Sequence, residues 1–246
     1  GLTQEAKGKT EETKPKAEKP KTEKSAIPTV GEKNEDGEYA YNAPFHEAVD
    51  NNTGDVIVGT KEYNMPLADG DTIQYTHVVA DAALILPSHD PSGHIGIGAT
   101  GTGENGNLNV ASLDLTEGYP ERDGKSANAR EYNTKSVIEA MFEHAYDLIS
   151  EYLLGSPTSS NGEPVITDDG VVISGNSRTM SLWVAIERNK DKKTKVKIKG
   201  ALRGVDGNYD RYLAALKEEI AGSPAKYAGI TVEQIDDMVA RGKHPI

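Results

Sequence analysis

Residues 169–182 read DGVVISGNSRTMSL, and this stretch decides the fold. Its apolar run at 171–173 lies between an Asp-Gly turn signal and Gly175, which is typical of a short strand. The residues that follow continue as MSLWVAIER, which is typical of a helix. A strand that passes through a glycine into a helix brings the first helical N–H groups together at one point. The stretch therefore predicts an α/β arrangement with a possible anion site at the helix start.

Gly175, Asn176, Ser177, Arg178 and Thr179 form the strongest candidate site in the chain. The glycine allows a tight turn, the arginine offers a forked donor to a phosphate, and the serine and threonine add hydroxyl groups. The alternative is an ordinary glycine turn in which Asn176 or Ser177 only caps the helix. The local chemistry leaves both interpretations open.

Other elements can be predicted on both sides of this stretch. Residues 164–167 and 171–174 flank the Asp-Gly turn, so they predict a β-hairpin. Residues 136–154 carry apolar side chains at i, i+3, i+4 and i+7, which indicates an amphipathic helix that ends at Gly155. Helices are also expected over 209–220 and 231–239, and strands at 56–58 and within 73–86.

Residues 84–91, with the sequence LILPSHDP, carry the second candidate site. Pro87 and Pro91 fix an irregular segment after a strand. His89 and Asp90 are residue types that serve in acid–base chemistry or bind metals. The alternative is a Ser-His-Asp turn that only satisfies its own backbone. Because Ser88, His89 and Asp90 are contiguous, they do not form a catalytic triad.

Two further stretches are rich in one kind of residue. Residues 93–107 contain six glycines and match the dinucleotide pattern G-x-G-x-x-G twice, but neither match sits between a strand and a helix, so we expect a mobile loop. The segment 188–203 is strongly basic and follows the helix that starts after Gly175. It predicts a strip that tracks nucleic-acid phosphates, and the alternative is an ordinary solvated loop. The lysines of this strip are Lys192, Lys193, Lys195, Lys197 and Lys199.

Composition narrows the class of protein. The 246 residues carry a net charge of −12, which argues against a uniformly basic DNA-coating surface. The absence of Cys excludes a disulfide scaffold, a Cys-based zinc site and a thiol nucleophile. No apolar run approaches the length of a membrane span. Residues 1–38 alternate lysine with acidic residues and proline, so we expect a disordered, extended linker.

Three motifs in one order resemble a known family. They are LPSHDP at 86–91, GSPTSSNGEPVI at 155–166 and the opening stretch at 169–182. Together they resemble the DdrB-like branch of the ParB/sulfiredoxin superfamily, whose motifs read IPSHDP, SPTATDGAPIV and DGVVxSGNGRTMAL. The resemblance covers residues 76–220. Ser177 departs from it, because the family usually has a second glycine at that position.

The resemblance implies an α/β (α+β) fold with a small mixed sheet and flanking helices, here preceded by the disordered linker. Members use the Gly-x-x-Arg helix start to hold nucleotide or nucleic-acid phosphates, which matches residues 175–179. The resemblance also places Glu163 at the edge of the pocket. It makes Arg122 and Arg130 additional phosphate contacts.

The function implied is binding of DNA or a nucleotide, with hydrolysis by a metal-dependent nuclease as a further expectation. His89, Asp90 and Glu163 are then the candidate catalytic residues, Mg²⁺ or Mn²⁺ the expected metal, and water with that ion the default nucleophile. The alternatives are an inert DNA-binding or virion-carried interaction module and a nucleotide-gated switch.

The resemblance also implies a setting for the domain. Such domains occur in phage and mobile-element polyproteins, so we expect residues 39–246 to be one ParB-like domain, with its core at 76–220, beside further domains. The chain stops about where relatives continue into a further strand, which we interpret as truncation at the C-terminus. The expected location is the host cytoplasm or a phage virion.

Overall fold

The computed structural model describes most of the chain beyond residue 41. The described residues are 42–66, 70, 72–91, 112–122, 125–126, 130–146, 153–155, 162–189, 196–199, 201–203 and 207–246. The predicted linker at 1–38 and the predicted loop at 93–107 lie outside them.

The described residues form helices and short antiparallel ladders. The helices are α1 (Ala43–Asp50), α2 (Lys135–Tyr146), α4 (Asn176–Asn189), α5 (Asn208–Gly222) and α6 (Val232–Ala240). The strands are β1 (Val56–Pro66), β2 (Thr72–Ala80), β3 (His89–Asp90), β4 (Asp114–Leu115), β5 (Glu121–Arg122), β6 (Lys125–Ser126), β7 (Val165–Ile166), β8 (Val172–Ser174), β9 (Val196–Ile198) and β10 (Ala201–Arg203). A short 3₁₀ turn, η1 (Ala82–Leu84), follows β2.

The strands pair two by two rather than in one continuous sheet. The ladders are β1–β2, β3–β4, β5–β6, β7–β8 and β9–β10, all antiparallel. A parallel bridge between Leu86 and Val171 connects the segment after η1 to the β7–β8 hairpin. The predicted α+β class is confirmed, and the mixed character of the pairing rests on this parallel bridge.

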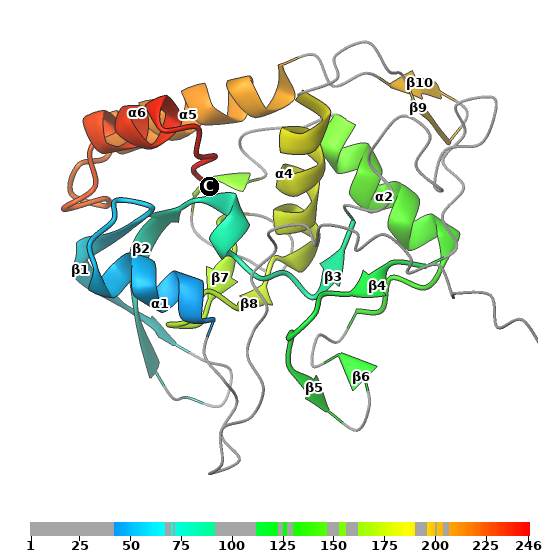
Figure 1. Ribbon diagram of the computed structural model, residues 1–246, viewed down its shortest axis with the longest axis horizontal. Coiled ribbons are helices and arrows are strands. Elements are labelled where there is room, and N and C mark those ends of the chain that lie inside the picture. Colours follow the sequence, from blue (N-terminus) through cyan, green and yellow to red (C-terminus); the bar gives the residue numbers. More distant parts are fainter. Residues whose placement is uncertain are drawn as a thin grey trace, which may run out of the picture.

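Helix α4 is the centre of the molecule. It lies beside α2, while α5 and α6 run across one end of the pair (Figure 1). Side chains on every face of α4 are buried, including Met180, Leu182 and Val184. Trp183, the single tryptophan of the chain, donates a hydrogen bond of 3.0 Å from Nε1 to the carbonyl of Ala82. The helix that follows Gly175 is therefore held from both sides.

Most predicted elements are present, with shifted ends. The hairpin predicted around the Asp-Gly turn is β7–β8, and the helix predicted over 231–239 is α6, whose capping box forms between Thr231 and Gln234. The helix predicted over 136–154 begins as α2, and residues 147–152 lie outside the described part. Helix α1 was not predicted, and β1 runs eight residues past Val58, with an irregularity in its pairing after that residue.

The core consists of two large apolar clusters and smaller ones. One joins α4 to α5, α6 and the loop at Tyr227, and another joins α2 to the opposite face of α4. A third cluster, around Phe45 and Ala80, lies under α1. Ile246 packs against both the first and the third cluster. Among the described residues, no helix combines the length and the apolar character needed to cross a membrane.

Candidate functional site

The start of α4 has the geometry that its sequence predicts. Gly175 adopts a φ of +87°, a left-handed conformation that glycine tolerates best. A Cβ at this position would lie 2.8 Å from Nη2 of Arg178 and 3.0 Å from the Cα of Pro164. The guanidinium of Arg178 thus lies back against the glycine, and its side chain is only 2% exposed. Only a glycine leaves room for this arrangement.

Asn176 holds the helix start in place. Its Oδ1 accepts from the backbone N–H of Ser88 at 2.6 Å, and its Nδ2 donates to the carbonyl of Val172 at 3.1 Å. The hydroxyl of Tyr119 donates to the same carbonyl at 2.7 Å. The side chain of Asn176 is therefore occupied within the protein, whereas Ser177 beside it is half-exposed. These contacts bring the two predicted sites, at 84–91 and 175–179, together in space.

His89 is buried in this arrangement. It is 5% exposed, its Nδ1 lies 2.9 Å from the hydroxyl of Ser88, and its ring meets that of Tyr132 edge-on at 4.9 Å. Burial lowers the pKa of His89, and the charge of Glu131 opposes this only in part. The imidazole is accordingly neutral near pH 7. Asp90 is half-buried and pairs in β3 with Asp114 of β4.

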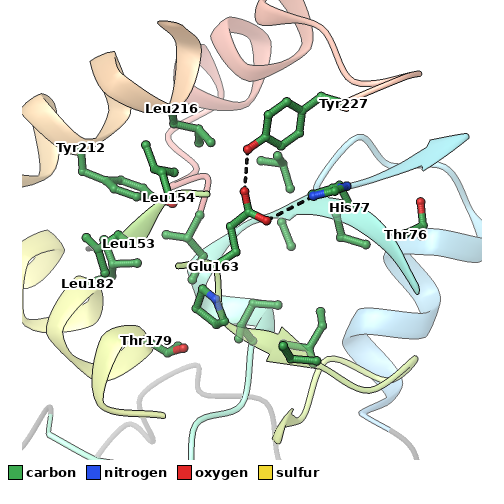
Figure 2. A pocket seen from close by; sticks show the side chains of 18 of the residues that line it. Thr76, His77, Leu153, Leu154, Glu163, Thr179, Leu182, Tyr212, Leu216 and Tyr227 are labelled. Carbon is green, nitrogen blue, oxygen red and sulfur yellow. Dashed lines mark hydrogen bonds and ion pairs between the residues drawn. The ribbon is translucent and has the colours of Figure 1, made fainter. Parts of the chain in front are cut away.

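A cavity opens beside the start of α4. It is lined by β2, by residues 163–166, by Thr179 and Leu182 of α4, and by Tyr212 and Leu216 of α5. Figure 2 shows the side chains of His77 and Tyr227 pointing toward the carboxylate of Glu163, and Leu153, Leu154 and Leu182 among the apolar residues that line the cavity. Its volume is about 130 Å³, whereas one water needs only about 10–15 Å³. The cavity is therefore large enough to hold several water molecules.

Glu163 is held by three donors at the rim of this cavity. Its Oε2 lies 3.2 Å from Nε2 of His77, and its Oε1 lies 2.8 Å from Nζ of Lys226 and 2.5 Å from the hydroxyl of Tyr227. Burial acts to raise its pKa, but the hydrogen bonds from His77, Lys226 and Tyr227 outweigh it and lower the pKa to about 2. A carboxylate this acidic stays ionised and is a weak base.

The tyrosines near Glu163 stay protonated. Burial, and then the hydrogen bond to Glu163 and its charge, raise the pKa of Tyr227. Burial and the same carboxylate raise the pKa of Tyr212. Sequence reasoning identified Glu163 but not its partners His77, Lys226 and Tyr227, because these lie in segments far from it along the chain. A Lys-Tyr pair in a loop between two helices carries no motif that could have revealed them.

The other predicted phosphate contacts lie on separate elements of the fold. Arg130 is exposed before α2, and the backbone of Arg122 lies in β5. In the predicted strip, Lys197 lies in β9, and Nζ of Lys199 forms an ion pair of 2.5 Å with Glu143 on α2. Lys192, Lys193 and Lys195 lie outside the described residues. All of these assignments stay predictions.

The described residues do not fit a metal site. Nowhere among them do three or more His, Asp or Glu side chains come close enough together to hold an ion. The carboxylate of Glu163 already accepts from three donors, and the side chain of His89 is buried.

Comparison with known proteins agrees with the motifs. The model of the ddrB-like ParB superfamily domain matches residues 68–239, which is well over half of the chain. The match takes in β2, the start of α4 and all but the last residue of α6. No curated protein and no solved structure matches the chain. On the extent of this match, the chain belongs to the ddrB-like ParB superfamily.

Proposed function

We propose that this domain binds a phosphate-bearing ligand, a nucleotide or a nucleic acid, at the start of α4. The observation that carries the proposal is the placement of a guanidinium at the start of a helix, directly against a glycine in the left-handed conformation. Helix α4 has 14 residues and no acidic residue in its first turn, while Arg178 lies there with its guanidinium packed against Gly175. The amino end of a helix already carries partial positive charge, so a fixed cation at that place favours an anion.

The surroundings support the same ligand class. Gly175 and Ser177 are half-exposed, so an anion can approach the first turn from solvent. Asn176 fixes the turn from inside through Ser88 and Val172, so little ordering is left for the ligand to impose. Membership of a ParB-type family supports a role connected with DNA.

The surroundings of Glu163 and His89 favour a domain that binds its ligand without hydrolysing it. Glu163 has a pKa of about 2, so it is a weak base, and His89 is buried against Tyr132. Neither is placed as a ready proton acceptor in the described part of the chain. Nuclease activity with Mg²⁺ or Mn²⁺ remains a second proposal, and the same experiment tests it.

The experiment compares Arg178→Ala with the unaltered chain by calorimetry. The titrants are the common nucleoside triphosphates and a short single- or double-stranded DNA, each with and without Mg²⁺ or Mn²⁺, and DNA nicking is followed in parallel. Hydrogen bonds to a charged group contribute about 1.5–3 kcal/mol, so affinity should fall about tenfold or more. Gly175→Ala should weaken binding as well, because its Cβ displaces Arg178.

Arg241→Gln is the matched control. It removes one positive charge from a partly exposed ion pair with Asp55 and Asp237, away from α4, and should leave affinity nearly unchanged. The fluorescence of buried Trp183 checks that each variant is folded. If Arg178→Ala is folded and binds every titrant with the same affinity as the unaltered chain, the assignment of the site to the start of α4 is wrong. The same conclusion follows if the unaltered chain binds none of the titrants.

A further inference from the structure

Tyr212 has a buried hydroxyl group that no described residue uses. The residue belongs to α5, lines the cavity beside α4 and is 3% exposed. Figure 2 shows its side chain pointing from α5 into the cavity, close to Leu154. Within the described part of the chain, its hydroxyl neither donates nor accepts a hydrogen bond. Buried polar groups are almost always hydrogen-bonded, so the cavity is the place for its partner.

The buried tyrosines around Tyr212 differ from it in this respect. The hydroxyl of Tyr209, one turn earlier on α5, donates to the carbonyl of Pro245 at 3.0 Å. The hydroxyl of Tyr227, across the cavity, donates to Glu163 at 2.5 Å. Burying a hydroxyl without a partner is costly, and the fold avoids this cost at both neighbours. The Tyr212 hydroxyl is therefore suited to bind a group that enters the cavity.

The group that fits this hydroxyl is a hydrogen-bond acceptor. Burial raises the pKa of Tyr212, and the charge of Glu163 raises it further, so the phenol keeps its proton. A protonated phenol donates through its O–H, and its oxygen accepts weakly because the ring withdraws electron density. A carbonyl oxygen, with two lone pairs and no proton, is a strong neutral acceptor.

The size and the walls of the cavity limit the rest of the occupant. The volume is about 130 Å³, and an engineered cavity of about 150 Å³ lined by Leu, Ile and Phe binds benzene. The walls near Tyr212 include Leu153, Leu182 and Leu216. The occupant is accordingly about the size of a single ring, and most of its surface is apolar.

A charge on the occupant is disfavoured whatever its sign. An anion would meet the carboxylate of Glu163, which is ionised and held by its three donors. A cation would compete for that carboxylate with the ammonium of Lys226, which lies 2.8 Å from it. Either ion would also lose its hydration on entering an apolar space. The occupant is therefore neutral.

We propose that the cavity beside α4 binds a neutral, single-ring carbonyl compound. Its carbonyl oxygen accepts from the hydroxyl of Tyr212, and its ring packs against the leucines of the walls. Thr179 lines the same cavity, and its hydroxyl donates to the carbonyl of Gly175 at 3.3 Å. The cavity thus adjoins the first turn of α4, but this ligand needs no phosphate, so its binding does not rest on the proposed phosphate site.

The test uses cyclohexanone and methylenecyclohexane, in which a C=CH₂ group replaces the carbonyl at nearly the same size. The affinity of each is measured by NMR titration on the unaltered chain, Tyr212→Phe and the matched control Tyr209→Phe. The net hydrogen bond corresponds to about two- to twelvefold in affinity. Tyr212→Phe should weaken cyclohexanone binding by that factor and leave methylenecyclohexane nearly unchanged, whereas Tyr209→Phe should change neither. Cyclohexanecarboxylate should bind the unaltered chain more weakly than cyclohexanone does.

Equal cyclohexanone affinity in the unaltered chain and in Tyr212→Phe would overturn the proposal. The absence of binding of both ring compounds would do so as well, since the cavity would then hold water only. Equal weakening by Tyr212→Phe and Tyr209→Phe, with Trp183 fluorescence showing that both are folded, would mean that the substitutions act through the packing of α5. Tighter binding of cyclohexanecarboxylate would assign the cavity to an acid. None of these readouts involves phosphate, so failure here is distinct from failure at the start of α4.

Discussion

Glu163 is the residue whose charge state depends most on the fold. Its pKa falls from the ordinary value of 4.5 to about 2 because His77, Lys226 and Tyr227 donate hydrogen bonds to the ionised form. A carboxyl group with a lowered pKa stabilises the folded state above its unfolded pKa, and this contribution is lost as pH falls toward the folded value. The difference corresponds to about 3 kcal/mol.

We expect Glu163→Gln to be less stable than the unaltered chain at pH 6, by up to about 3 kcal/mol. The gap should narrow as pH falls from about 4.5 to about 2, since both proteins then carry a neutral side chain at this position. Urea unfolding followed by Trp183 fluorescence at several pH values measures it. A gap that stayed constant across this range would show that the charge of Glu163 does not stabilise the fold.

At the same scale, the sequence marked residues 175–179 as a candidate site but did not predict how their side chains lie. Arg178 was expected as a forked donor to phosphate and Ser177 as an added hydroxyl, with Asn176 or Ser177 as an ordinary helix cap in the alternative. The structure turns Asn176 inward onto Ser88, leaves Ser177 half-exposed and lays Arg178 against Gly175. Side-chain direction at a helix start depends on the segments packed around it, and the local sequence does not contain that information.

The element on which the site depends is α4, and Asn176 is its anchor. Asn176→Ala removes the acceptor of the Ser88 N–H and one donor to the carbonyl of Val172, both in buried surroundings. An unsatisfied buried group costs about 1–3 kcal/mol, so the free energy of unfolding should fall by that amount.

Ser177→Ala, one position along, is the matched control. Its half-exposed side chain should change stability by no more than about 0.5 kcal/mol. Chemical denaturation of both variants measures the difference. Equal effects would mean that Asn176 is not the anchor of the helix.

Among the elements, those with a strong pattern were predicted and those without were not. The apolar stripe of α2 and the capping box of α6 carry their own signals. Helix α1 has only eight residues, too few for a clear period, although Asn42 as cap and Pro44 in the first turn are signals that could have revealed it. The outer half of β1, with the sequence TKEYNMP, is polar and is held by pairing with β2 rather than by burial.

At the scale of the whole molecule, the last residues join parts that are distant in sequence. Ile246 packs against two clusters, and Arg241 and Lys243 form ion pairs with Asp55. Deleting residues 244–246 removes three backbone hydrogen bonds to β2 and η1 as well as the Ile246 side chain. Burying one such side chain contributes about 1.5–3 kcal/mol, so a loss of about 3 kcal/mol or more is expected.

Asp237→Asn serves as the comparison for this deletion. It breaks only the exposed ion pair between Asp237 and Arg241, which should contribute less than about 1 kcal/mol. Urea unfolding of the two variants under the same conditions measures both losses. A deletion no more harmful than Asp237→Asn would contradict a joining role for the last residues.

The arrangement of the whole could not be read from the sequence. Local patterns predict helices and hairpins, but the cavity beside α4 arises where β2, residues 163–166 and α5 meet. The side chains that face one another there, such as His77 and Tyr227, come from opposite ends of the domain. Such meetings depend on how the clusters pack, and this one chain carries no pairwise signal that would reveal them.

The attachment of the last residues to β2 has a topological consequence. Asn42, the first described residue, donates from Nδ2 to the carbonyl of Leu84, and Ile246 pairs with Ala80 a few residues away. Both ends of the described structure therefore contact the same short stretch, residues 80–84. A short linker between Ile246 and Asn42 would close the chain into a ring. Cut open again at exposed Gly70, between β1 and β2, the ring would become a circular permutant that retains every contact described for α4.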